Sequence, residues 1–251
     1  MLTTLAIALS FIVLAFLAAA LPSAFMRRRY GHEQPAETRE LGREVTARIG
    51  VLHGLILGLV FGQVVAQDND LRNGIQAEAA AVEQVWYDAA RYGGAPQLQR
   101  AAEAYMHAVV ERDWPRQQAQ AQVSDEGWRA WRTMLDASLA LEPGNRRQSL
   151  LASSIHAEVL QIQRLRQVRG YHSAALPFEF WFAAIVGLVL IGAVMFVHQA
   201  DRKHLALVGA YSTYAGLVLF MIWDLSQPYK GMIGIGPEAF VQALESIRSG
   251  I

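Results

Sequence analysis

The chain has 251 residues, with 22 Lys and Arg balanced by 22 Asp and Glu, so its formal net charge at pH 7 is zero. Because a broad nucleic-acid-binding surface needs an excess of basic residues, we expect no nucleic-acid partner. The absence of cysteine excludes disulfides, thiolate catalysis and thiolate metal sites.

Charged residues are nearly absent from four apolar segments, at residues 2–25, 49–67, 176–197 and 205–223. Each segment is close to the ~20 residues that cross a bilayer core. We therefore predict four transmembrane helices and contact with the lipid bilayer. The first segment has no basic residues before it and exceeds the apolar core of a signal peptide. We expect it to be a retained anchor.

The second apolar segment carries a glycine at every fourth position, namely at Gly50, Gly54, Gly58 and Gly62. This spacing places the four glycines along one side of a helix, where they form a row without side chains. Such small-residue faces allow membrane helices to approach one another closely. We predict that this glycine row is a helix-packing surface, against adjacent spans or against other copies of the chain in a ring-like homo-oligomer.

The residue before each glycine is bulkier, which gives a second row of side chains along the helix. Three residues of this row are candidates for a pore constriction, namely His53, Leu57 and Phe61. His53 is the only ionisable residue deep in any span, which makes it a functional candidate. It is either a titratable ring in a pore or a neutral imidazole bonded to a neighbouring helix, for example to Ser212 or Thr213. Leu57 and Phe61 either form a dewetting constriction or merely pack.

Residues 68–172 are polar and show helical periodicity, so we predict an extramembrane domain of packed helices. Strong helix breakers at residues 93–96, 115 and 143–145 separate the predicted helices, which are 71–92, 97–114, 124–141 and 147–170. The stretch at 68–74 is turn-forming, with Asp68 or Asn69 as a helix cap. We nevertheless expect the first and the last of these helices to run continuously out of the spans that flank them.

The predicted fold is therefore all-α, a four-helix transmembrane protein with a helical-bundle extramembrane domain inserted between spans 2 and 3. The predicted parts are residues 1–67 (spans 1 and 2 with a short basic connector at 27–48), 68–172 (the helical domain), 173–225 (spans 3 and 4) and 226–251 (a C-terminal segment). Pro237 suits the first turn of a short terminal helix at 237–249.

Polar residues at the ends of the spans are predicted to lie at the membrane interface. Asp224 near Lys230 suggests an interfacial ion pair or a helix-terminus contact, and Glu179 has the same two interpretations. No enzyme signature is present, and we predict no catalytic residues and no cofactor.

The helical domain offers one candidate set of metal ligands, at Glu78, Glu83, His107 and Glu111, of which His107 and Glu111 share a helix face. Helical bundles that hold metals normally supply paired Glu-X-X-His segments, which this chain lacks. We therefore predict a solvated helix face and no metal.

Basic residues dominate the two short connectors, at Arg27, Arg28, Arg29, Arg39, Arg43, Arg48, Arg202 and Lys203. By the positive-inside rule this side is cytoplasmic, which places the helical domain and both termini outside. Four basic residues at the opposite ends of the spans favour the reverse orientation. They are Arg164, Arg166 and Arg169 before the third span and Lys230 after the fourth.

Several segments together resemble a bacterial bestrophin-like membrane family of unknown function, distantly similar to bestrophin anion channels. They are the VFGQVV end of the second span, Glu78-Ala79, the stretch from Tyr105 to Val109 with Glu111-Arg112-Asp113-Trp114-Pro115 after it, and the exit WDLSQPYKG. The resemblance implies a four-span protomer, a helical domain between spans 2 and 3, and assembly around an axis lined by the second span. Bestrophins keep this domain and both termini in the cytoplasm, whereas the basic connectors of this chain predict that they lie outside. We keep the orientation predicted by the connectors. The segment after residue 231 lacks the acidic cluster of a calcium clasp.

These observations predict an oligomeric membrane channel or channel-like pore in a bacterial inner membrane. The family resemblance implies that it is anion-selective and that its cargo is an inorganic anion. The alternative is a non-conducting structural or sensory subunit whose helical domain binds a protein partner.

Overall fold

The computed structural model describes residues 2–31, 33–171, 176–198, 201–232 and 234–250. These residues form helices, turns and loops without a strand, which confirms the all-α prediction. They divide into two compact units. The first unit comprises residues 1–66, 174–227 and 231–233, and the second comprises 67–173, 228–230 and 234–251. The predicted boundary at 172–173 lies outside the described residues.

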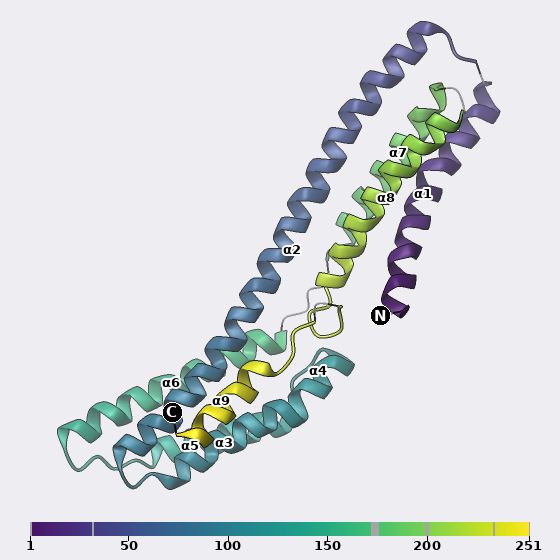
Figure 1. Cartoon of the computed structure of the whole chain (residues 1–251). Helices are drawn as coiled ribbons and strands as arrows, with labels where there is room; N and C mark the ends of the chain where they lie inside the picture. The colour runs from purple at the N-terminus through teal and green to yellow at the C-terminus, as the bar shows by residue number, and fades with distance from the viewer. Residues whose placement is uncertain (1, 32, 172–175, 199–200, 233, 251) are drawn as a thin grey trace. The chain divides into compact units, whose positions relative to one another are not determined.

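The first unit is built from α1 (Leu2–Tyr30), the N-terminal part of α2 (Ala36–Tyr92), α7 (Phe178–Val194) with the 3₁₀ turn η2 (Met195–Val197), and α8 (Arg202–Leu225). Helix α1 packs against both α7 and α8 (Figure 1). The approach is close because Gly192 and Gly216 face the α1 backbone, where an added Cβ would overlap Ala19 and Ile12. Within the described residues, four helices are long and apolar enough to cross a membrane, as predicted.

The second unit combines the C-terminal part of α2 with α3 (Pro96–Ala108), the π-helical turn η1 (Val109–Asp113), α4 (Trp114–Gln120), α5 (Asp125–Leu139), α6 (Arg146–Tyr171) and α9 (Glu238–Ser249). Their apolar faces share one core, which includes Val82, Tyr105, Met134, Ile155 and Phe240. Phe240 comes from α9. The C-terminal segment, predicted as a part of its own, thus adds its helix to this core.

Helix α2 is continuous from Ala36 to Tyr92, as predicted for the helix that follows the second span, so the helix cap predicted at Asp68 or Asn69 is wrong. The predicted junction of α6 with the third span lies outside the described residues. Asp68 accepts a hydrogen bond from Arg72 one helical turn later, with 2.7 Å between Oδ2 and Nε. Leu71 and Ile75 are buried in the core. Burial of this apolar face outweighs the weak local preference of Asn and Gly for a turn. The predicted connector at 27–48 is also too long, since α1 reaches Tyr30 and α2 begins at Ala36.

Pro115 was predicted to end a helix, but the chain widens there into one π-helical turn and continues. Proline lacks a backbone N–H and crowds the preceding turn of an α-helix. The wider turn accommodates it, with the Trp114 N–H donating to the Val109 carbonyl five residues back. This turn buries Asp113 completely. Single π turns of this kind recur at functional sites.

Candidate functional site

The glycine row lies on a part of α2 that the other described spans leave uncovered. A Cβ built at Gly50, Gly54, Gly58 or Gly62 would meet no neighbouring atom within 4 Å. The row therefore packs on none of the described spans of its own chain. Packing against another copy of the chain remains a prediction.

His53 and Leu57 are buried inside the first unit, at 2% and 3% exposure. His53 Nδ1 lies 2.6 Å from the Tyr211 hydroxyl, and Nε2 lies 2.9 Å from the Ala184 carbonyl oxygen. The structure thus contains the imidazole bonded to neighbouring helices, with partners other than the predicted Ser212 or Thr213. Leu57 belongs to the apolar core of this unit, and Phe61 packs half-buried at its edge.

The three predicted interfacial charges have separate environments. Both carboxylate oxygens of Asp224 accept from the Met232 N–H, at 2.9 and 3.0 Å, so this residue holds the turn after α8. Lys230 Nζ donates to the Ala119 carbonyl at 3.2 Å. Glu179 is exposed in the first turn of α7, where a negative charge is favourable to the helix dipole.

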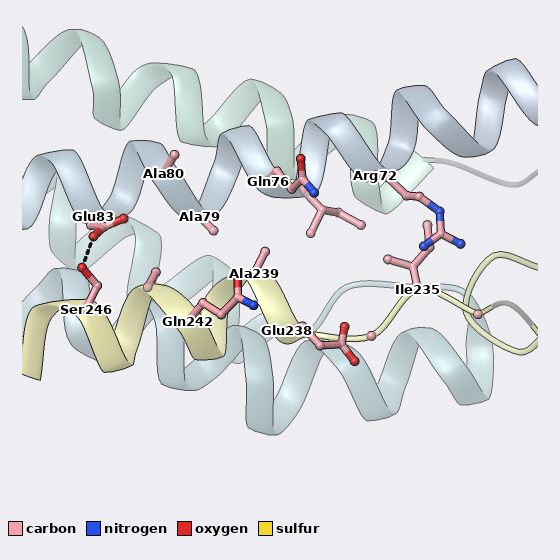
Figure 2. Close-up of a pocket in the computed structure, with 14 residues that line it drawn as sticks. Arg72, Gln76, Ala79, Ala80, Glu83, Ile235, Glu238, Ala239, Gln242 and Ser246 are labelled. Carbon is pink, nitrogen blue, oxygen red and sulfur yellow. Dashed lines mark hydrogen bonds between the residues drawn. The ribbon is translucent and has the colours of Figure 1, made fainter.

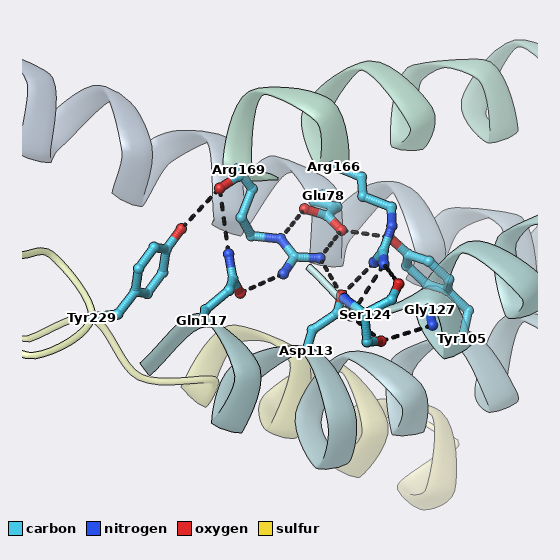
Figure 3. A network of polar contacts seen from close by, with 9 residues as sticks. All are labelled: Glu78, Tyr105, Asp113, Gln117, Ser124, Gly127, Arg166, Arg169 and Tyr229. Carbon is cyan, nitrogen blue, oxygen red and sulfur yellow. Dashed lines mark hydrogen bonds and ion pairs between the residues drawn. The ribbon is translucent and has the colours of Figure 1, made fainter. Parts of the chain in front are cut away.

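The second unit contains a buried network of charged side chains, centred on Arg169 and Glu78 (Figure 3). Arg169 Nε and Nη2 donate to the two oxygens of Glu78 at 2.8 and 2.9 Å. Arg169 Nη1 donates to Gln117 Oε1 at 2.8 Å. The Tyr105 hydroxyl donates to Glu78 at 2.5 Å. One arginine of α6 is thereby fixed to α2 and α4.

Asp113, placed by the π-helical turn, forms the second half of the network. Its carboxylate accepts from Arg166 and, at 3.0 Å, from Arg169 Nη2. It also accepts from the Ser124 N–H and hydroxyl at 2.8 and 2.5 Å. Ser124 caps α5 by accepting from the Gly127 N–H. A side chain at Gly127 would overlap the Arg166 guanidinium, so glycine is required there.

The network pairs two guanidinium groups with two carboxylates, which balances its charge. Burial alone would raise the pKa of Asp113, but the hydrogen bond from Arg166 and the charges of both arginines hold it below its usual value. Burial and the nearby Glu78 charge raise the pKa of Tyr105, so its hydroxyl keeps the proton that it donates. The lowered pKa of Asp113 and the raised pKa of Tyr105 keep the first ionised and the second protonated, which suits a structural clamp between helices better than proton transfer.

A family model described as bestrophin-like domain matches residues 10–240. The matched segment contains three of the four apolar helices, the first from residue 10 onward, and every residue of the buried network. The chain belongs to the bestrophin-like family. No significant match was found among curated proteins or solved structures. With its four apolar helices, this bestrophin-like chain is a membrane protein.

Sequence reasoning missed the network of this bestrophin-like protein, although it singled out several of its members. Asp113 stood out only as part of a family motif, and Glu78 as part of a family motif and of the rejected metal set. Arg166 and Arg169 stood out only as charges near a span. The available signal was the Arg-X-X-Arg spacing on α6, which places both guanidinium groups on one helix face. Their partners come from distant parts of the sequence, so spacing alone could not identify them.

The second unit of the bestrophin-like chain also has a cavity of about 670 Å³ between α2 and α9 (Figure 2). Glu83 on α2 accepts a hydrogen bond from Ser246 on α9 at 2.5 Å. Arg72, Gln76 and Glu238 also line the cavity. Among the described residues, no group of three or more His, Cys, Asp or Glu is arranged to hold a metal ion.

Proposed function

We propose that this membrane protein forms a ring-like homo-oligomer in a bacterial inner membrane and acts as an anion-selective channel or channel-like pore. The glycine-bearing segment of α2 would line or border the pore. The observation that carries the proposal is the glycine row, which the described spans of its own protomer leave uncovered. Membership in the bestrophin-like family supports the same assignment.

Anion selectivity is supported by the basic end of the first unit. Arg27 Nη2 donates to the His198 carbonyl at 3.0 Å and contacts His204 Nε2 at 2.9 Å. Burial and the charges of Arg43, Arg27 and Arg39 lower the pKa of His198, which reflects a positive local field. Such a field at a pore mouth raises the local concentration of anions.

The same basic connectors favour a cytoplasmic position for this end, with the second unit and both termini outside. Two of the competing charges, Arg166 and Arg169, are neutralised by Asp113 and Glu78. Both side chains are buried inside the second unit, whereas Arg164 is exposed and still opposes this orientation.

The alternative is a non-conducting subunit whose second unit binds a protein partner. The burial of His53 and Leu57 favours it, because only Phe61 of the predicted constriction row is partly exposed on the protomer. If the protein is a channel, we propose that Phe61 and the glycine side of α2 form the constriction.

Subunit number tests both candidates. Particle images of the full chain in lipid nanodiscs should show a ring with a continuous axial path. Gly58→Leu should disrupt the ring, because it adds bulk within the glycine row. The control Leu52→Phe adds bulk at an exposed position on another side of α2, and should keep the ring. A single copy, or a ring with a lipid-sealed axis, would favour the non-conducting subunit.

A further inference from the structure

We propose that the basic end of the first unit binds an anionic phospholipid of the surrounding bilayer, whose phosphate group is held by three arginines. They are Arg27 in the last turn of α1 and Arg39 and Arg43 near the start of α2, and we call them the arginine cluster. The acyl chain of the lipid lies along the exposed side of α2 that follows Arg43. The inference does not depend on channel activity, because it concerns lipid binding alone.

Helix packing brings the arginine cluster together at the end of the third span. Arg27 Nη2 donates to the His198 carbonyl at 3.0 Å, one residue after the span ends at Val197. A Cβ at Gly42 would overlap the Val197 side chain, so this turn of α2 lies directly against the same span end. The two arginines of α2 stand three positions before and one position after this glycine. Burial and the charges of all three arginines lower the pKa of His198, which agrees with their convergence.

The arginine cluster has no acidic partner in the described part of the chain, where none of its three side chains forms an ion pair. Two nearby acids are bonded elsewhere, since Glu44 pairs with Arg48 at 3.2 Å and Asp201 accepts the His204 N–H at 2.7 Å. The other acids of this connector are exposed to water, namely Glu33, Glu37 and Glu40. Guanidinium groups bind phosphate oxygens through paired N–H donors. A phosphate therefore supplies the negative charge that the described side chains do not.

The side of α2 that carries Arg39 and Arg43 continues as an exposed apolar row. At every fourth position the exposed residues are Arg39, Arg43, Ala47, Val51 and Leu55. Val51 and Leu55 are 73% and 56% exposed. The helix rises about 18 Å from Arg43 to Leu55, close to the ~15 Å of hydrocarbon in one leaflet. A charged end followed by an apolar row of this length matches a phospholipid and not a free phosphate ion.

The depth of the arginine cluster also favours a lipid. Arg27 and the Gly42 turn both contact the chain where the third span ends, which is the level of the lipid headgroups. Basic residues between span ends are a recurring means of binding anionic headgroups. The row from Arg39 to Leu55 lies one position after the glycine row, about 100° around the helix. The lipid thus occupies a different side of α2 from the predicted helix-packing surface.

Electron paramagnetic resonance with spin-labelled lipids tests the site, using the full chain in phosphatidylcholine vesicles. The probe is phosphatidylglycerol with a spin label on one acyl chain, and the control is phosphatidylcholine with the same labelled chain. We expect a larger motionally restricted fraction for the probe than for the control. Inorganic phosphate or glycerol 3-phosphate, added at constant ionic strength, should leave this fraction unchanged. Equal fractions for the two lipids, or release of the probe by either soluble phosphate, would overturn the proposal.

Single substitutions connect the lipid preference to the arginine cluster. Arg39→Gln and Arg43→Gln should each lower the association of the probe, relative to the control lipid, by about fivefold. The matched control is Arg48→Gln, which removes an exposed arginine of the same helix that is paired with Glu44. It should change the ratio by less than about twofold. Circular dichroism verifies folding of each variant. If a folded cluster variant keeps the original ratio, or Arg48→Gln lowers it as much, the cluster is not the site.

Discussion

Arg169 and Glu78 lie 91 positions apart in the sequence and form a completely buried, two-point ion pair. The pair connects α6 to α2, and Asp113 and Gln117 extend it to the π-helical turn and α4. Replacing a buried pair by apolar residues is often neutral, but removing one partner leaves an uncompensated charge. The network should therefore be sensitive to single substitutions.

Arg169→Met should reduce the free energy of unfolding by about 3–5 kcal/mol, because it leaves Glu78 buried without its cation. A urea titration of the full chain in nanodiscs, followed by circular dichroism, measures the change. Arg164→Met is the matched control, since Arg164 is exposed on the same helix. It should change stability by less than about 0.5 kcal/mol. Similar values for the two variants would contradict a stabilising role for the pair.

The stability of the second unit should fall in acid because of Asp113. Its pKa in the folded protein is lower than the value of about 3.9 in an unfolded chain. The stabilisation is therefore present above about pH 4 and is lost as pH falls through the folded pKa. Urea titrations between pH 7 and pH 3 should show a shallower decline for Asp113→Asn than for the unsubstituted chain. Asp125→Asn, at an exposed carboxylate, should keep the original slope.

The packing around His53 gives a test in the first unit. A Cβ at Gly187 would overlap the His53 ring, whereas one at Gly209 would meet no atom within 4 Å. Gly187→Ala should destabilise the protein by about 1–3 kcal/mol through overpacking. Gly209→Ala should be neutral or slightly stabilising, because alanine favours helices. Thermal unfolding in nanodiscs measures both variants, and a neutral Gly187→Ala would argue against this placement of His53.

The four spans and most helices of the second unit could be predicted, because both depend on local properties of the sequence. The length of an apolar segment decides whether a helix can cross a bilayer, and Gly-Gly or Pro-Gly pairs separate helices. The terminal helix was predicted from Pro237 and is confirmed, beginning at Glu238. The continuity of α2 with the second span was predicted, but the helix cap at Asp68 or Asn69 was wrong, because burial of Leu71 and Ile75 is a tertiary effect that local propensity does not contain.

The candidate sites were harder to predict, because they depend on how each helix is rotated and on what it meets. Spacing placed His53 and Leu57 on one side of α2, but could not say that this side faces α7 and α8. The partner of His53 is Tyr211 rather than its sequence neighbour Ser212, a difference of one position and about 100° around the helix. The pairing of Arg166 with Asp113 could not be predicted from spacing either, because 53 positions separate the two residues.

The most direct test of the proposed channel is the electrical conductance of the purified oligomer in planar bilayers with a chloride gradient. We predict currents whose reversal potential lies close to the chloride equilibrium potential, and a strong reduction of these currents in Gly58→Leu but not in Leu52→Phe. A correctly folded oligomer that gives no conductance above background would contradict the channel and favour the non-conducting subunit.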